Sequence, residues 1–176
     1  MKLTEGDIEI DIPDAVGGGR FDGPEHGLSR CMKAVDFVME LADRYLFIEL
    51  KDPQHPRATT QSRNKFKERL HRGVLDEDLK YKYRDSFLYE WAAGRADKPI
   101  YYFVLVALDT LDEVELLTRT EALARNLPQR GPDDQPWLRE IVCACGVFNI
   151  ESWNRKLPHY PVNRVGAGAQ DAGTTP

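Results

Sequence analysis

Hydrophobic and polar positions follow one another along the chain in patterns that predict a series of strands and helices. Residues 8–12 alternate with a period of two and stop before a proline, which is typical of a half-buried strand. Two runs rich in β-branched and aromatic residues, 34–41 and 45–51, are separated by Ala42-Asp43-Arg44 and predict a β-hairpin. An Asp-Pro pair ends the second run, because proline cannot continue an interior ladder.

The segment after the hairpin has the spacing of two helices. Thr59, Thr60 or Ser62 is expected to cap the first helix, which should end at Gly73. Asp76 is expected to cap the second, where an acidic first turn suits the helix dipole. The buried stripe of this second helix is expected to repeat every four residues, through Leu79, Tyr83, Phe87 and Trp91.

The remaining chain continues in the same style. Residues 100–108 form a continuous apolar run, which predicts a strand covered on both faces. A helix is expected over 112–126, a further strand over 141–150 and a short helix over 151–157. This order of elements predicts an α/β fold with a central mixed β-sheet flanked by helices.

Two stretches are expected to lie outside the regular elements. Gly17–Gly19 are interpreted as a plain flexible loop, because no Lys-Ser or Lys-Thr pair follows them as in a phosphate-binding loop. Residues 166–176 are small and polar, which predicts a disordered tail. Residues 1–165 are therefore expected to form one domain.

The composition, 41% hydrophobic and 30% charged, is that of a soluble globular protein. Its apolar runs are too short to cross a bilayer, and no apolar run follows the N-terminal lysine as in a secretory signal. Cys31, Cys143 and Cys145 are an odd number without further zinc ligands, so they are interpreted as buried free thiols. These features predict a cytoplasmic protein without a membrane partner.

Charge is distributed unevenly along the chain. The net charge of −5 argues against a protein that coats nucleic acid non-specifically. Between Arg57 and Arg84, however, nine Lys or Arg stand against four Asp or Glu. Arg63, Lys65 and Lys67 are candidates for contacts with a phosphate backbone; the alternative is that they are solvated faces of amphipathic helices.

Three hairpin residues can meet on one face of the sheet. Glu49 and Lys51 are two positions apart and therefore point the same way. Asp36 lies opposite Glu49 if the loop is Ala42-Asp43, and opposite Lys51 if the loop is Asp43-Arg44. A three-residue loop would place Asp36 on the other face, unless a bulge restores it.

This combination of side chains suits a divalent metal ion. Two carboxylates and a lysine are costly to bury without partners, and Mg²⁺ or Mn²⁺ accepts carboxylate oxygens while keeping several waters. Asp36 and Glu49 are the predicted ligands, and Lys51 is predicted to orient a water or to stabilise charge developing on a phosphate. The alternative is an edge hairpin whose Glu49 and Lys51 form an ordinary ion pair on a solvated face.

The same residues resemble the signature of a known enzyme superfamily. Asp36, twelve intervening positions and Glu49-Leu50-Lys51 are similar to the motif of the PD-(D/E)XK nucleases, with Val35-Asp36 where Pro-Asp is often found. The resemblance covers residues 31–108. It implies a restriction-endonuclease-like core, metal-dependent cleavage of nucleic acid with DNA favoured over RNA, and a homodimer as in many small relatives.

One part of the family pattern is not evident in the sequence. The helix that often supplies a further glutamate does not appear before the hairpin, and Glu25 and His26 are the candidates for that extra ligand. Two rival interpretations therefore stay open. The chain could be a nuclease-fold module that has lost its chemistry and holds DNA or a protein, or an unrelated α/β domain in which the motif is accidental.

Overall fold

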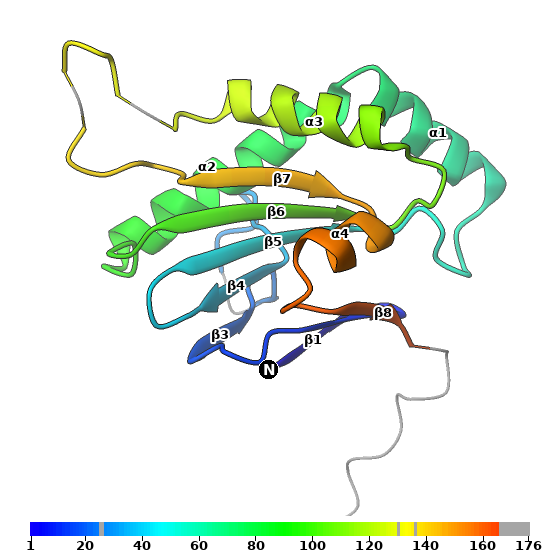
Figure 1. Ribbon diagram of the computed structural model, residues 1–176, viewed down its shortest axis with the longest axis horizontal. Coiled ribbons are helices and arrows are strands. Elements are labelled where there is room, and N and C mark those ends of the chain that lie inside the picture. The colour runs from blue at the N-terminus through cyan, green and yellow to red at the C-terminus, as the bar shows by residue number, and fades with distance from the viewer. Residues whose placement is uncertain (25–26, 130, 136, 166–176) are drawn as a thin grey trace, which may run out of the picture.

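A five-stranded mixed sheet forms the centre of the protein. The computed structural model describes residues 1–24, 27–129, 131–135 and 137–165 (Figure 1). The sheet order is β3-β4-β5-β6-β7, in which β3, β4 and β5 pair antiparallel while β6 and β7 run parallel to β5. The strands are β3 (Gly17–Arg20), β4 (Phe37–Glu40), β5 (Tyr45–Lys51), β6 (Ile100–Val106) and β7 (Ala144–Phe148).

Further elements cover both faces of this sheet (Figure 1). Helices α1, α2 and α3 lie on one side, and α4 lies on the other together with a small antiparallel sheet of order β1-β2-β8. The predicted α/β fold with a central mixed sheet and flanking helices is confirmed. The bounds are α1 (Thr60–His71), α2 (Val74–Ala92), α3 (Glu113–Asn126), α4 (Ile150–Lys156), β1 (Lys2–Glu5), β2 (Ile8–Asp11) and β8 (Val162–Arg164).

The hairpin of β4 and β5 has the first of the two registers considered above. Phe37 pairs with Ile48, and Glu40 pairs with Tyr45. The backbone N–H of Leu41 donates to the carbonyl of Arg44 at 2.8 Å, so the connecting loop is the two-residue one at 42–43. Extended by one step, this register places the residue before β4 opposite Glu49.

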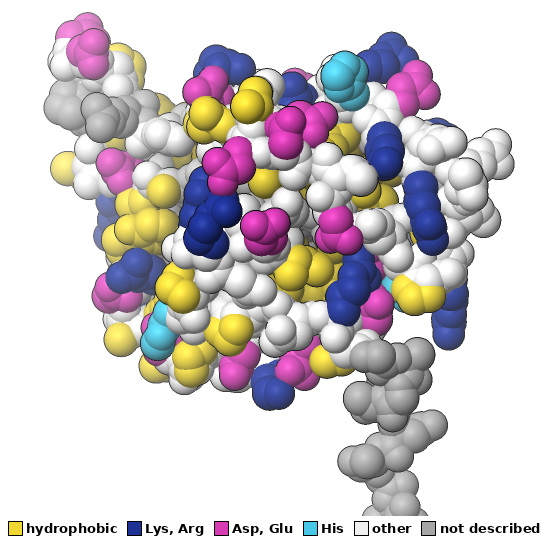
Figure 2. All heavy atoms as spheres, turned by 45° about the vertical axis from the view of Figure 1, so that its right-hand side comes forward, with side chains coloured by type: hydrophobic (Ala, Val, Ile, Leu, Met, Phe, Trp, Pro, Cys, Tyr) yellow, Lys and Arg dark blue, Asp and Glu magenta, His cyan; other side chains and the backbone are white. Residues whose placement is uncertain are grey.

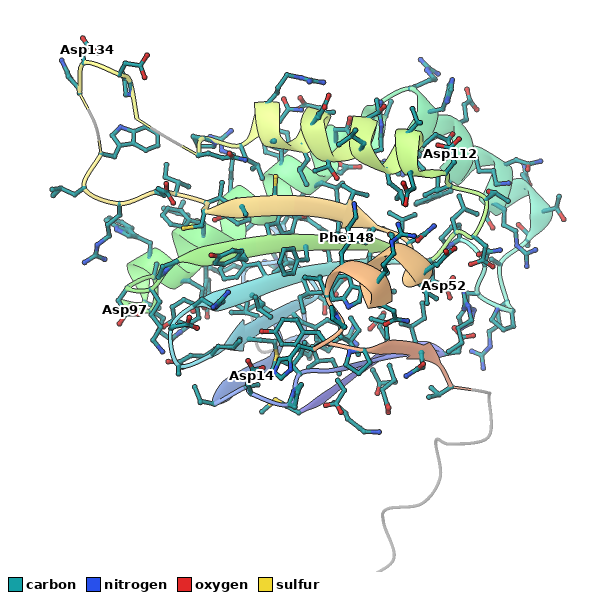
Figure 3. All side chains as sticks on the ribbon, in the orientation of Figure 1. Asp14, Asp52, Asp97, Asp112, Asp134 and Phe148 are labelled. Atoms are coloured by element: carbon teal, nitrogen blue, oxygen red, sulfur yellow. The ribbon has the colours of Figure 1, made fainter. Side chains whose placement is uncertain are left out.

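Two hydrophobic cores lie on the two faces of the sheet. Phe47 and Val104 pack with α2 and α3, whereas the neighbouring Ile48 and Leu105 pack with α4 and the small sheet. The second core is strongly aromatic. Phe148 lies at the end of β7 (Figure 3). Its ring meets that of Trp153 of α4 edge-on, with ring centroids 5.6 Å apart. Strands β5 and β6 are therefore covered on both faces, as the apolar run 100–108 predicts.

The glycine triplet is a strand, not the expected loop. Gly17–Arg20 pairs with β4 and forms an edge of the main sheet. Gly18 has a φ of +100°, and a Cβ there would lie 2.2 Å from the carbonyl oxygen of Val38. Glycine has low strand propensity, so its sequence signal is that of a loop, but here it permits a backbone approach that a larger residue would block.

The second predicted helix begins earlier than expected, and its predicted stripe is buried at Leu79 and Tyr83 but not at Trp91. Helix α2 starts at Val74, so Asp76 lies inside its first turn instead of capping it. Trp91 is 63% exposed, whereas Tyr83 is fully buried. Each step of four residues turns an α-helix by about 40° beyond a full circle, which carries the end of a four-residue repeat away from the core. The residues of α2 that are buried are Leu75, Asp76, Leu79, Tyr83, Ser86 and Glu90.

Several smaller expectations need correction. Strands β1 and β8 were not expected, because each has only three or four residues and little periodic signal. The last strand of the main sheet covers only five residues of the predicted 141–150. All three cysteines are free thiols, but Cys31 is exposed and Cys143 and Cys145 are only partly buried. The predicted tail at 166–176 lies outside the described residues.

Candidate active site

Asp36 stands directly before β4 and is held against the neighbouring strand. The residue is 6% exposed, and its Oδ2 accepts a hydrogen bond from the backbone N–H of Leu50 at 2.6 Å. That contact fixes the aspartate beside β5 through the backbone of Leu50 and does not involve the Leu50 side chain. Asp36 therefore contacts β5 one position beyond the last paired residues of the hairpin, Phe37 and Ile48.

Glu49 and Lys51 come from the end of β5 and face the helical side of the sheet. Glu49 is fully buried, and the ammonium of Lys51 donates to its Oε1. The Lys51 side chain is 32% exposed, so it reaches from the buried carboxylate towards solvent. The sheet thus brings together the three predicted residues. Asp36 and Glu49 are buried, and Lys51 lies between them and the solvent.

A fourth charged residue, Lys82 of α2, completes the cluster. Its Nζ lies 2.6 Å from Oε1 of Glu49 and 3.2 Å from Oδ1 of Asp36. The two carboxylate oxygens are therefore no farther apart than the sum of these two distances. The sequence interpretation missed Lys82, whose only signal was its membership of the basic segment between Arg57 and Arg84.

Burial and neighbouring charges shift the pKa values of Glu49 and Lys82. Burial raises the pKa of Glu49, Lys51 and Lys82 oppose that rise, and the nearby Asp36 adds to it. For Lys82, burial lowers the pKa, but attraction by Glu49 and Asp36 outweighs it and the pKa is raised. The cluster is thus a compact set of two acidic and two basic groups, with Glu49 the most desolvated member.

The donor atoms suit a hard divalent cation in kind, and one of them lacks a partner. Oε2 of Glu49 is buried and makes no hydrogen bond to any described residue. Carboxylate oxygens are the ligands that Mg²⁺ and Mn²⁺ prefer. Among the described residues, however, no group of three or more His, Cys, Asp or Glu side chains is placed to hold a metal ion. Two carboxylates meet here, and the candidates Glu25 and His26 lie outside the described residues.

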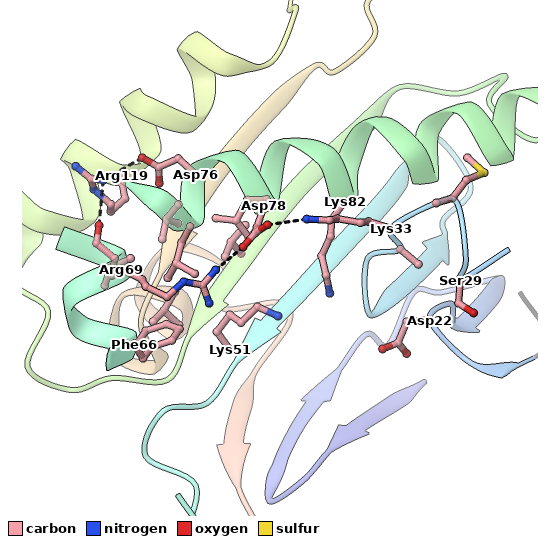
Figure 4. Close-up of a pocket in the computed structure, with 18 of the residues that line it drawn as sticks. Asp22, Ser29, Lys33, Lys51, Phe66, Arg69, Asp76, Asp78, Lys82 and Arg119 are labelled. Atoms are coloured by element: carbon pink, nitrogen blue, oxygen red, sulfur yellow. Dashed lines mark hydrogen bonds and ion pairs between the residues drawn. The ribbon is translucent and has the colours of Figure 1, made fainter. Parts of the chain in front are cut away.

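The cluster opens into a cavity of about 520 Å³ (Figure 4). We call it the α1–α2 cavity, because these helices wall it together with residues 22–23, Ser29, residues 32–34 and strand β6. Lys51 and Lys82 line it, and their ammonium ends point into the same space (Figure 4). A ligand in the cavity would therefore reach the lysines that contact Glu49.

The candidate backbone-binding residues of α1 lie on different sides of that helix. Lys67 lines a second hollow, between α1 and α3, and Lys65 is exposed. Arg63 is partly buried, and its Nε has no hydrogen-bond partner among the described residues. Arg69, another basic residue of the segment between Arg57 and Arg84, lines the α1–α2 cavity with Lys51. Acidic, basic and hydrophobic side chains are mixed over the face in Figure 2, without a large area of one charge.

Comparison with known proteins adds no family assignment. No protein-family model, no curated protein and no solved structure matches this chain. Within the described residues, no helix combines the length and the apolar character needed to cross a membrane.

Proposed function

We propose that this protein is a metal-dependent nuclease of the PD-(D/E)XK type that hydrolyses phosphodiester bonds of nucleic acid, with DNA favoured over RNA. The observation that carries the proposal is the position of Lys82, whose ammonium contacts both Asp36 and Glu49. Because one ammonium group contacts both carboxylates, a divalent ion in the same place could bind both of them. The hairpin motif, followed across α2 by a parallel strand, supports a restriction-endonuclease-like core.

The roles follow from the positions of the side chains. Asp36 and Glu49 would hold Mg²⁺ or Mn²⁺, which supplies a polarised water and neutralises phosphate charge when bound. Lys51 and Lys82 present ammonium groups at the mouth of the cavity, where they would stabilise negative charge on a phosphate oxygen. In the reaction, a water oxygen bonds to phosphorus while the bond from phosphorus to the leaving sugar oxygen breaks.

Calorimetric titration with Mg²⁺ and Mn²⁺, paired with cleavage assays on single-stranded and duplex DNA and RNA, tests the proposal. Asp36→Asn and Glu49→Gln should weaken ion binding, because each removes an ionised ligand. Lys51→Ala should still bind the ion but lose most turnover. Glu9→Gln is a suitable control, because it removes a carboxylate of β2 whose partner is the exposed Lys2.

The titration and the cleavage assays have a clear negative result. If the wild-type protein binds neither ion, or if all three site variants cleave as the wild type does, the proposed function is wrong. The homodimer is an expectation from the resemblance, and light scattering of the purified protein measures it directly.

A second candidate function is favoured by the same lysine. With Lys82 in place, Asp36 and Glu49 already have a positive partner inside the protein. A module that binds nucleic acid or protein without cleaving it would need no metal ion at these carboxylates, because the ammonium of Lys82 already contacts both of them. It predicts that wild-type protein takes up no divalent ion, whereas Lys82→Met, which leaves two carboxylates without that partner, binds one.

A further inference from the structure

The α1–α2 cavity combines an apolar interior with a cationic mouth. Its inner wall comes from Leu75 and Leu79 of α2 and from Val104 and Val106 of β6. The half-buried ring of Phe66 on α1 also lines it (Figure 4). A phosphate group would lose its hydration against such walls without gaining hydrogen bonds, so the interior suits a flat, largely apolar group.

The mouth of the cavity carries positive groups from four separate segments, together with the acidic Asp22 and Asp78. Besides Lys51 and Lys82, it includes Lys33 and Arg69. Both are bound to the carboxylate of Asp78, Lys33 at 2.6 Å and Arg69 at 2.5 Å (Figure 4). All three of these side chains are 40–49% exposed, so the ion pairs are weak and an incoming anion can replace them.

We propose that the α1–α2 cavity receives the base of one unpaired nucleotide, whose phosphate lies at the cationic mouth. The proposal rests on the nuclease function above and narrows its substrate to a strand with an accessible, unpaired base. A base has an apolar face that stacks on aromatic rings, and it is linked to a phosphate a few bonds away. Those two properties match the ring of Phe66 inside and the lysines at the rim.

A continuous duplex fits this arrangement less well. A paired base is held in the stack, and entry into a protein cavity requires that it be unpaired and turned out of the helix. A duplex could touch only the rim, through Lys33 and Arg69, whereas a single strand can use rim and interior together. The contact with the base is therefore what separates this proposal from ordinary binding to a phosphate backbone.

Equilibrium binding without metal ions tests the base contact separately from cleavage. The probes are three fluorescently labelled DNAs of equal length: a single strand, the same strand with abasic sites, and a duplex. Wild-type protein should bind the intact single strand about tenfold more tightly than the abasic strand, which has the phosphates but no bases. Equal affinity for the intact and abasic strands would overturn the proposal.

Phe66→Ala identifies the surface that the base contacts. It should lower affinity for the intact strand about tenfold and leave the abasic strand unchanged. Trp91→Ala is the matched control, an exposed aromatic residue on α2 that does not line this cavity. Phe66→Leu keeps the apolar filling but cannot stack, and it covers the case in which the alanine variant fails to fold. If neither Phe66 variant changes the preference for bases, the cavity is not the base site.

The salt dependence of binding locates the phosphates. Lys33→Gln and Arg69→Gln should each flatten the plot of log affinity against log salt by roughly 0.7 for a single strand. If Lys65→Gln and Lys67→Gln flatten it instead, the strand follows the outer side of α1 and the proposal is wrong. Failure of ion binding with an intact base preference would overturn the nuclease function alone, so the two failures are distinguishable.

Discussion

The two faces of the central sheet are built from adjacent residues of the same strand and differ in what they bury. On one face, Ile48 and Leu50 pack against α4 and the small sheet in a core where Trp153 is fully buried. On the other face, Glu49 is equally buried but lies among Asp36 and two lysines beside a cavity. Among the described residues, the buried acidic side chains all belong to this second face or its helices.

This difference shows that burial alone does not indicate a stabilising role. An apolar side chain in a packed core gains free energy from removal from water, whereas a buried ion pair often gains less than its desolvation costs. We call the side of the sheet that packs against α4 the α4 face, and the side that packs against α2 the α2 face. The α4 face is therefore expected to stabilise the fold, whereas the charged residues of the α2 face are expected to serve in binding. The predictions below test that division.

The largest expected effect is on the α4 face. Trp153→Ala should lower the free energy of unfolding by about 4 kcal/mol, because it empties a fully buried position that contacts Phe103 and Phe148. Urea denaturation followed by circular dichroism measures the loss. Trp91→Ala, at a 63% exposed position, should change stability by less than about 0.5 kcal/mol. Equal losses in the two variants would contradict the division.

The next effect is on the α2 face. Lys82→Met should cost about 3 kcal/mol, because it leaves Glu49 and Asp36 buried together without the cation that contacts both. Under the proposed function, Mg²⁺ should restore part of this loss and should stabilise the variant more than the wild type. Lys80→Met is the control, since Lys80 pairs with a largely exposed glutamate on the same helix and should cost only about 0.5 kcal/mol. A variant as stable as the wild type in the absence of metal would show that the contacts of Lys82 do not hold the cluster.

A smaller effect concerns pH. Burial raises the pKa of Glu49 above its ordinary value of 4.5, so the folded protein retains a proton where the unfolded chain has lost it. The free energy of unfolding should therefore fall as pH rises from near 4.5 to the raised pKa, by at most about 1.4 kcal/mol per pH unit. Glu49→Gln removes this contribution, so denaturation at several pH values should give a flatter profile. Identical slopes in the two proteins would mean that Glu49 does not hold the extra proton.

The smallest loss in the free energy of unfolding is expected from a double replacement. Glu49→Leu combined with Lys82→Met removes one charge of each sign and fills the space with apolar atoms. Its stability should equal or exceed that of the wild type, because buried ion pairs replaced together by hydrophobic residues are often neutral or stabilising changes. Denaturant unfolding and calorimetric ion binding are both required, since the variant should bind no divalent ion. A large loss of stability would show that the ion pairs themselves support the fold.

The local parts of the fold could be predicted because they depend on residues that are close together in the sequence. The period of two in the hairpin and its short connection left two registers with Asp36 on the face of Glu49, beside a three-residue loop that would place it on the other face. The structure has the first of these registers. Helix α3 likewise begins after the predicted residue, with Asp112 as its N-cap in a capping box. Patterns of this kind depend on neighbours a few positions apart.

The missed features depend on contacts between distant segments. Gly17–Arg20 is a strand because β4 lies beside it, not because glycine favours an extended chain. Lys82 joins the candidate site because α2 crosses above β5, and no spacing in the sequence connects it to Glu49. The α1–α2 cavity is also a product of packing, since its walls come from helices, a strand and the segment before the hairpin.

The small sheet has a consequence for how the chain folds. Strand β2 pairs with β8, and Arg164 bonds to Asp7 across a separation of 157 residues in sequence. Two-stranded hairpins are marginal by themselves, and contacts of long sequence separation slow folding because a large loop must close first. During synthesis, strand β2, whose isoleucines are fully buried in the folded protein, could pair only with β1 until residues 162–164 had left the ribosome. The pairing of β2 with β8 would thus join two segments that are synthesised at widely separated times.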